Sequence, residues 1–162
     1  MTWKNAFLRQ ARSDFRTFRD LQKGNAPLCH QAHYVQMATE KLAKAYLCPP
    51  DGEPPRPTHD ALVKFLRVCI ERPEIRRRLG FGDVTICRAH IRGLLPLAGQ
   101  IQELAPEGGA LDKPNPEYPW RDAGSWQVCS PLDYAFPQFA NAKDPQIGRL
   151  LNLVRRLLET DL

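Results

Sequence analysis

The sequence predicts an all-α fold, an up-and-down bundle of about five helices with a long loop before the last one. Apolar residues recur at helical spacing in several segments, and no segment of consequence alternates like a strand. Most of the fifteen prolines fall within 49–57 and 106–137, which are therefore loops. With 162 residues, of which 43% are hydrophobic, we expect a single domain over 1–162, with loops at about 49–57 and 106–142.

Two amphipathic helices are expected in the N-terminal part of the chain. The first runs from Trp3 to Lys23 and ends at Gly24. Pro27 suits the first turn of the second, which continues to about Leu47 before two prolines. Opposite its apolar side, the second helix carries a set of mainly polar residues: His30, His33, Met37, Glu40, Lys41 and Lys44. We expect this side to meet solvent or a partner surface.

The remaining helices are placed by their caps and prolines. Thr58 is expected to cap a third helix that ends near Ile70, and a short helix follows Pro73. Asp83 suits the cap of a long helix from Val84 to about Leu104. Asp144 and Pro145 open the last helix. Residues 106–142 lack periodicity and are rich in proline, glycine and aromatic residues, so this long loop should be functional or well packed.

Charge and cysteine content limit the class of protein. The net charge of +5 and the sequence pI of about 9.1 favour anionic partners, such as nucleic acid, nucleotides or acidic proteins. The five cysteines are odd in number and none has C-x-x-C spacing, which is typical of reduced thiols in a cytoplasmic protein. No signal peptide precedes them and no apolar run is long enough to span a membrane. We therefore expect a cytoplasmic location.

Several enzyme classes lack their motifs. His30, His33 and Glu40 invite a metal interpretation, but HExxH spacing is absent and these residues lie opposite the apolar face. The phosphate-binding loop, the dinucleotide-binding glycine pattern and the G-x-S-x-G elbow are all missing. We therefore expect no metal and no cofactor.

An arginine stripe on the first helix is the best physical candidate for binding an anion. Arg9, Arg12, Arg16 and Arg19 follow one another at spacings of three, four and three along one flank. Guanidinium groups pair bidentately with phosphates, so four on one flank can follow a nucleic-acid backbone. The alternative is that these arginines merely flank the helix core, with Asp14 and Asp20 pairing with some of them.

Two motifs resemble those of one known family. The segment QMATEKLAKAYL, residues 36–47, is similar to the second-helix signature of HEPN domains, close to Q-x-A-x-E-K-x-x-K-A-x-L. Thr58, His59 and Asp60, followed by Leu62, resemble the T-H-D/N-L opening of the family's third helix. The signature residues are Gln36, Glu40, Lys41 and Lys44. The segment EYPW, residues 117–120, stands where the family often has R-Y-P.

The resemblance implies a small helical bundle that tends to form homodimers. It also implies a role beside minimal nucleotidyltransferases, in toxin–antitoxin or defence systems, with nucleotide binding in some members. The ribonuclease branch of the family uses an R-x4–6-H motif. No histidine of this chain has an arginine at that spacing, and Glu117 replaces the usual R-Y-P arginine. The resemblance therefore indicates a non-catalytic member.

Three hypotheses remain open at this stage. The chain is a binding module for nucleotide, RNA or a partner nucleotidyltransferase; a metal-independent ribonuclease toxin; or a purely structural adaptor. A ribonuclease would need His33 or His59 as its base, with an arginine from the other protomer. We expect no catalytic residue and regard these two histidines as weak candidates only.

Overall fold

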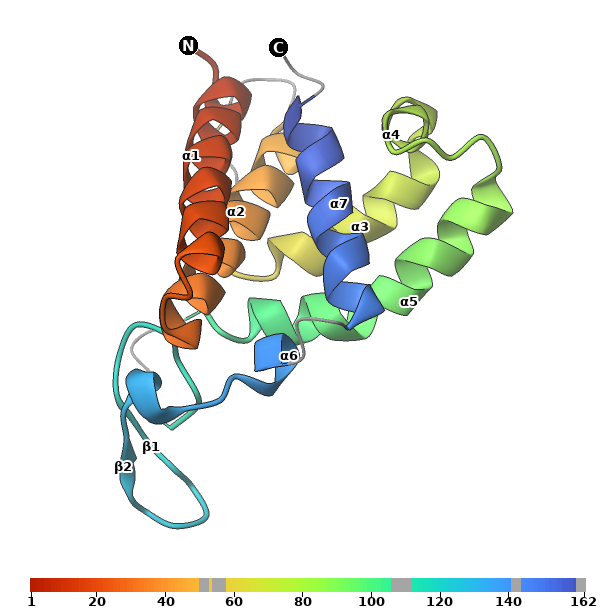
Figure 1. Cartoon of the computed structure of the whole chain (residues 1–162). Coiled ribbons are helices and arrows are strands. Elements are labelled where there is room, and N and C mark those ends of the chain that lie inside the picture. Colours follow the sequence, from red (N-terminus) through yellow and green to blue (C-terminus); the bar gives the residue numbers. More distant parts are fainter. Residues whose placement is uncertain (50–52, 54–57, 106–111, 141–143, 160–162) are drawn as a thin grey trace.

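The structure is a computed structural model that describes residues 1–49, 53, 58–105, 112–140 and 144–159. Most of the proline-rich segment after Pro49 and the first part of the predicted 106–142 loop lie outside the described residues. The described residues form a mostly helical bundle (Figure 1), so the predicted all-α class is confirmed. The expected number of about five helices matches the long ones, and two further helices, α4 and α6, are short.

The first two helices form an antiparallel pair. Helix α1 spans Trp3–Lys23, and the Thr2 side chain caps it by accepting from the Asn5 amide. Helix α2 spans Leu28–Leu47 and packs against α1, α3, α5 and α7. Alanines make this central position possible, because small side chains let several neighbours approach one helix. The fully buried ones are Ala32, Ala38, Ala43 and Ala45.

The middle of the chain adds three helices. Helix α3 spans Ala61–Glu71, α4 spans Pro73–Arg78 and α5 spans Val84–Gln102. The predicted Asp83 cap is confirmed, since its Oδ1 accepts from the amides of Thr85 and Ile86 at 2.5 and 3.2 Å. The predicted Thr58 cap is wrong. Thr58 instead donates its hydroxyl to Asp60 Oδ1 at 2.7 Å, and the helix begins only after Asp60.

The last helix closes the bundle beside the first. Helix α7 spans Pro145–Glu159, and Asp144 Oδ1 accepts from the Gln146 amide at 2.8 Å, as its predicted place before Pro145 requires. Its apolar stripe is buried: Ile147, Leu150, Leu153, Val154, Leu157 and Leu158. Figure 1 shows α7 running between α1 and α5, with the start of α1 and the end of α7 at the same end of the bundle.

One continuous core joins the long helices. Its largest fully buried side chains include Phe18, Phe65, Leu42, Leu66, Ile91, Leu94, Leu150 and Leu157. The five cysteines are free thiols, and Cys29, Cys69 and Cys87 are buried. Burial raises the pKa of the Cys69 and Cys87 thiols, so both stay protonated at neutral pH.

The segment before α7 contains a hairpin that the sequence did not predict. Strands β1 (Trp120–Arg121) and β2 (Val128–Cys129) pair antiparallel, with Trp120 opposite Cys129. A 3₁₀ turn at Pro131–Asp133 and helix α6 (Pro137–Ala140) follow. Figure 1 shows the hairpin projecting from the bundle near the end of α1.

Aromatic residues anchor the base of this hairpin. Trp120 is buried and stacks edge-on against Tyr134, which stacks edge-on against the fully buried Phe136. Phe136 belongs to a second apolar cluster with Cys29, Ala32 and Leu104.

Across the described residues, every helix falls short of the length and apolar character that crossing a bilayer requires.

Candidate functional site

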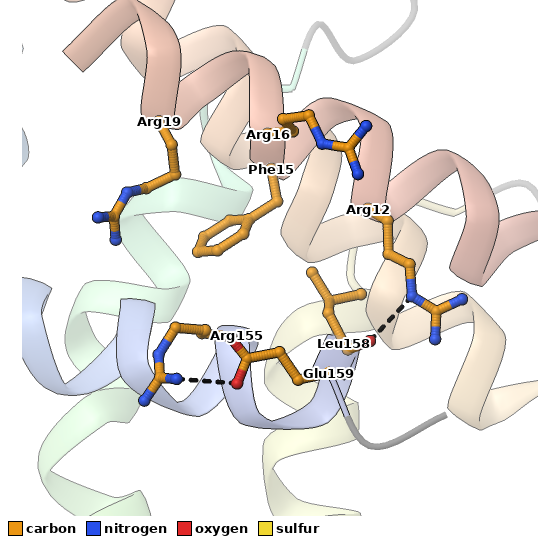
Figure 2. Close-up of a pocket in the computed structure, with 7 residues that line it drawn as sticks. All are labelled: Arg12, Phe15, Arg16, Arg19, Arg155, Leu158 and Glu159. Carbon is orange, nitrogen blue, oxygen red and sulfur yellow. Dashed lines mark hydrogen bonds and ion pairs between the residues drawn. The ribbon is translucent and has the colours of Figure 1, made fainter. Parts of the chain in front are cut away.

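An open pocket of about 380 Å³ lies between the first and last helices. Its walls come from α1 and from the C-terminal turns of α7. The lining residues are Arg12, Phe15, Arg16, Arg19, Arg155, Leu158 and Glu159 (Figure 2). Cationic side chains therefore dominate the lining, around an apolar floor made by Phe15 and Leu158.

Helical periodicity brings the arginines to this place. Ala11, Phe15 and Phe18 face the core, so Arg12, Arg16 and Arg19 fall on the flank beside that face. In Figure 2, Arg19 and Arg155 approach one end of the pocket from opposite helices. The Phe15 ring occupies the middle, and Arg16 and Arg12 lie toward the other end.

Arg12 has a structural role at the pocket's edge. Its Nε donates to the carbonyl of Leu158 at 2.8 Å, in the last turn of α7. A cation at this position satisfies an orphan carbonyl and complements the helix dipole. Among the described residues its buried Nη2 has no hydrogen-bond partner, so one donor of this side chain stays unused.

Arg16 and Arg19 are available to a ligand. Both are exposed, and neither makes a hydrogen bond or an ion pair with another residue in the described part of the chain. Two unpaired guanidinium groups facing a hollow are suited to bidentate recognition of phosphate or carboxylate groups. Arg155 supplies a third cation from the opposite wall.

One carboxylate opposes these cations. Glu159 ends α7 and pairs with Arg155, with 2.8 Å between Glu159 Oε2 and Arg155 Nη1. Arg155 also donates to Asn152 Oδ1 at 2.9 Å. The pair is largely exposed, so it contributes little to stability. Its main effect is to lower the positive potential inside the pocket.

The predicted arginine stripe is thus divided by the structure. Arg12, Arg16 and Arg19 line one pocket, whereas Arg9 is exposed outside it. Sequence reasoning missed Phe15 as part of the floor, and it missed Arg155, Leu158 and Glu159 on α7. Spacing within one helix cannot show which second helix completes a site.

The family-signature residues of α2 form a second polar cluster. Glu40 is buried and accepts from Gln36 Nε2 at 2.7 Å and from Lys44 Nζ at 2.5 Å. Its Oε2 also lies 3.1 Å from His59 Nδ1, ahead of α3. Burial raises the pKa of Glu40, but the hydrogen bonds and charges of Lys44 and His59 outweigh it, so the pKa lies below its ordinary value.

Lys41 extends this polar clustering toward α1. Its Nζ lies 2.6 Å from Oδ2 of the buried Asp14, whose Oδ1 accepts from Gln10 at 3.0 Å. Asp14 therefore pairs with a lysine of α2 and not with the arginine stripe. The expectation that the polar side of α2 meets solvent or a partner is wrong for Glu40, because α1 and α3 cover that part of the helix. The signature residues join helices within the chain.

Each weak catalytic candidate is a histidine held by a carboxylate. His33 Nδ1 lies 2.8 Å from Glu117 Oε1, which belongs to the segment before β1. His59 Nδ1 is held by Glu40, and its side chain is 40% exposed. In both rings this leaves Nε2 on the opposite edge, where a general base would use it. His30 is exposed. His90 has a pKa lowered by burial and by the charge of Arg149.

Metal-ligating side chains do not converge within the described ranges. In that part of the chain no three His, Cys, Asp or Glu side chains lie close enough together to hold a metal ion. His33 and Glu40 share one side of α2, but His33 pairs with Glu117 and Glu40 pairs with His59.

Comparison with known proteins adds no relative: no protein-family model, no curated protein and no solved structure matches this chain.

Proposed function

We propose that this chain is a HEPN-like, non-catalytic binding module that holds the phosphates of a nucleotide or an RNA strand in the α1–α7 pocket. One observation carries the proposal. Arg16 and Arg19 are unpaired among the described residues, and with Arg155 on the opposite wall they line a hollow with an aromatic floor. Guanidinium groups bind phosphates, and an aromatic side chain accepts a base by stacking.

The family part of the proposal rests on the signature residues. Gln36, Glu40 and Lys44 contact one another, and His59 of the Thr58–Asp60 motif joins them. Two motifs that are separated in sequence therefore meet in one cluster, as parts of one fold signature would. On this basis we also propose a homodimer and a partner nucleotidyltransferase in a toxin–antitoxin or defence system.

The binding proposal is tested by RNA affinity as a function of salt. A fluorescent single-stranded RNA and a labelled ATP analogue are titrated with the wild-type chain and with R16E/R19E. We expect the double variant to bind at least about tenfold more weakly. The slope of its RNA affinity against salt should fall by about 1.4, because two arginines no longer neutralise a phosphate each on the single strand.

A matched control separates site from charge. R88E/R92E changes the net charge equally at two exposed positions of α5, outside the pocket. It should keep most of the affinity and most of the salt slope. If RNA affinity decreased equally in both double variants, net charge alone would explain the effect, and the proposed site would be wrong.

A second candidate function is favoured by the carboxylate-held histidines. In a metal-independent ribonuclease, His59 Nε2 would take the proton of a 2′-hydroxyl, which attacks the adjacent phosphorus and expels the 5′-oxygen. Glu40 orients the ring. This function would be established if the wild-type chain cleaves RNA in a buffer that contains a chelator, if the H59A variant has lost this activity, and if the H30A variant has kept it. We expect no cleavage by the wild-type chain.

A further inference from the structure

The segment of the β1–β2 hairpin carries apolar side chains that the described residues leave exposed. This segment holds four of the eight large apolar residues that are exposed among the described residues. They are Tyr118 (55% exposed), Trp126 (72%), Val128 (70%) and Leu132 (64%). Trp126 and Val128 belong to the hairpin itself, and Tyr118 and Leu132 flank its base. Single apolar residues are normal on a surface, but several on one short projecting segment indicate an interaction site.

The hairpin is built to hold this display in place. Asp122 Oδ2 accepts from the Ser125 amide and hydroxyl, both at 2.7 Å, and the Trp126 amide donates to the Asp122 carbonyl at 2.8 Å. At the base, buried Asn115 accepts from the amides of Glu117 and Tyr118 at 2.7 and 3.2 Å. The tip is thus fixed by its own hydrogen bonds.

Trp126 has an unfavourable backbone conformation and an exposed side chain at the tip of the hairpin. Its φ is 60°, a left-handed conformation that bulky residues rarely adopt. Its indole is also 72% exposed, so burial among the described residues does little to offset the cost of this backbone conformation. An occupant that buries the indole would offset this cost, and buried tryptophans are among the commonest anchors of protein interfaces.

Charge indicates what kind of surface the hairpin fits. Residues 112–135 contain four carboxylates and only two cations, whereas the whole chain has a net charge of +5. A complementary surface must therefore be basic and must contain an apolar hollow for the indole. The α1–α7 pocket of the same chain has both properties, with arginines around Phe15 and Leu158.

We propose that the hairpin of one copy docks into the arginine-lined pocket of a second copy, with Trp126 entering between the guanidinium groups. Indole faces attract guanidinium cations, and more strongly when water is excluded. None of the described hairpin residues lines the pocket of its own chain, so that pocket is left open to the hairpin of a second copy. A reciprocal exchange gives a closed pair with two such contacts.

This inference rests on the pocket and the homodimer of the proposed function and adds the contact that joins the two copies. If an RNA strand and the partner copy's hairpin need the same arginines, each displaces the other. RNA would then dissociate the pair, and self-association would weaken RNA binding.

Sedimentation equilibrium of the full chain tests the contact. We expect W126S and R16E/R19E each to raise the dimer dissociation constant at least about tenfold. The controls are W3S, which removes another half-exposed tryptophan, and R88E/R92E; both should leave the constant unchanged. Circular dichroism of every variant verifies the fold. If either control weakens association as much as its counterpart, the proposed contact is wrong.

Mixing the two weakened variants gives the sharper result. W126S keeps an intact pocket and R16E/R19E keeps an intact hairpin, so one contact is restored in the mixed pair. We expect the mixture to associate more tightly than either variant alone. Three results would each overturn the inference: a strictly monomeric wild type, pairing that R16E/R19E does not affect, or a mixture without restored association. The first is expected if the hairpin binds only an unrelated protein. The second is expected if the two hairpins pair with each other.

The same variants keep this inference separate from the proposed function. W126S leaves the pocket intact and removes only the competing hairpin, so it should bind RNA at least as tightly as the wild type. Retained RNA binding by W126S, together with self-association of the wild type that W126S does not weaken, would leave the proposed function standing and remove only the hairpin contact.

Discussion

At the scale of single residues, Glu40 organises more of the molecule than any other charged side chain of α2. It is buried, and Gln36, Lys44 and His59 all contact its carboxylate. These contacts join α2 to the start of α3. A carboxylate in this position must stay ionised, because its protonation would leave the partly buried Lys44 without a counter-charge.

The first prediction concerns acid stability. The pKa of Glu40 is lower in the folded chain than its ordinary value of 4.5, so its contribution is complete above pH 4.5 and is lost as the pH falls through the folded pKa. Glu40→Gln should lower the unfolding free energy by about 3 kcal/mol at pH 7. In a plot of unfolding free energy against pH, it should also make the decrease at acidic pH, here called the acid limb, less steep. Urea unfolding between neutral and acidic pH measures both.

The exposed Glu71→Gln serves as the control, since it also ends as a neutral amide on a helix. It should shift stability by less than about 0.5 kcal/mol at pH 7. An acid limb of unchanged steepness in Glu40→Gln would contradict the role given to this carboxylate.

The second prediction concerns Glu159. Its carboxylate pairs with Arg155 inside an otherwise cationic pocket, and the pair is exposed. Glu159→Gln should therefore increase affinity for single-stranded RNA severalfold, while changing stability by less than about 0.5 kcal/mol. Fluorescence anisotropy at fixed salt measures the gain. Glu71 ends α3 as Glu159 ends α7, so Glu71→Gln makes the same charge change away from the pocket and should give a much smaller gain.

At the scale of elements, local signals predicted the helices well. Gly24, Pro27, Asp83 and Pro145 each mark a boundary within one or two residues of the observed one, because capping and proline effects act over a single turn. Thr58 failed because its hydroxyl bonds to the neighbouring Asp60 carboxylate, a competition that a capping rule does not contain.

The hairpin and the pocket escaped prediction for a different reason. Each strand has only two residues, too few for an alternating pattern, and the pair is held by the Trp120–Tyr134–Phe136 stack. The pocket depends on α1 and α7, whose lining residues are about as far apart in sequence as the chain permits. Arg12, Arg16 and Arg19 were identifiable from spacing, but their partners on α7 came only from tertiary packing.

The third prediction tests whether the hairpin is an independently stabilised element. Trp120 is buried outside the main core, between the hairpin and Tyr134. Trp120→Ala should release the hairpin, so that its amides exchange with solvent far faster, while the helices keep their protection. Hydrogen exchange read by mass spectrometry locates the change. The control is Trp126→Ser, which leaves the base of the hairpin intact and should not accelerate exchange at residues 115–120.

At the scale of the whole molecule, the pocket connects the two ends of the chain. Its walls are the first and the last helix, and within it Arg12 of α1 bonds to the Leu158 carbonyl of α7. A ligand that contacts Arg155 together with Arg16 or Arg19 therefore adds a further contact between α1 and α7. These two helices are separated in the sequence by all the other helices and strands. Occupancy of the pocket and stability of the bundle are thus coupled by mass action.

The fourth prediction follows from that coupling. RNA present at about a hundred times its dissociation constant should stabilise the folded chain by about 2.7 kcal/mol, which raises the melting temperature by several degrees for a chain of this size. Because its affinity is at least about tenfold lower, R16E/R19E should show at most about half of this shift at the same RNA concentration, while R88E/R92E should keep the whole shift. Thermal unfolding followed by circular dichroism at low salt measures all three. If R16E/R19E retained the full shift, the ligand would bind elsewhere, because a ligand stabilises the folded chain wherever it binds and this variant changes only arginines of the pocket.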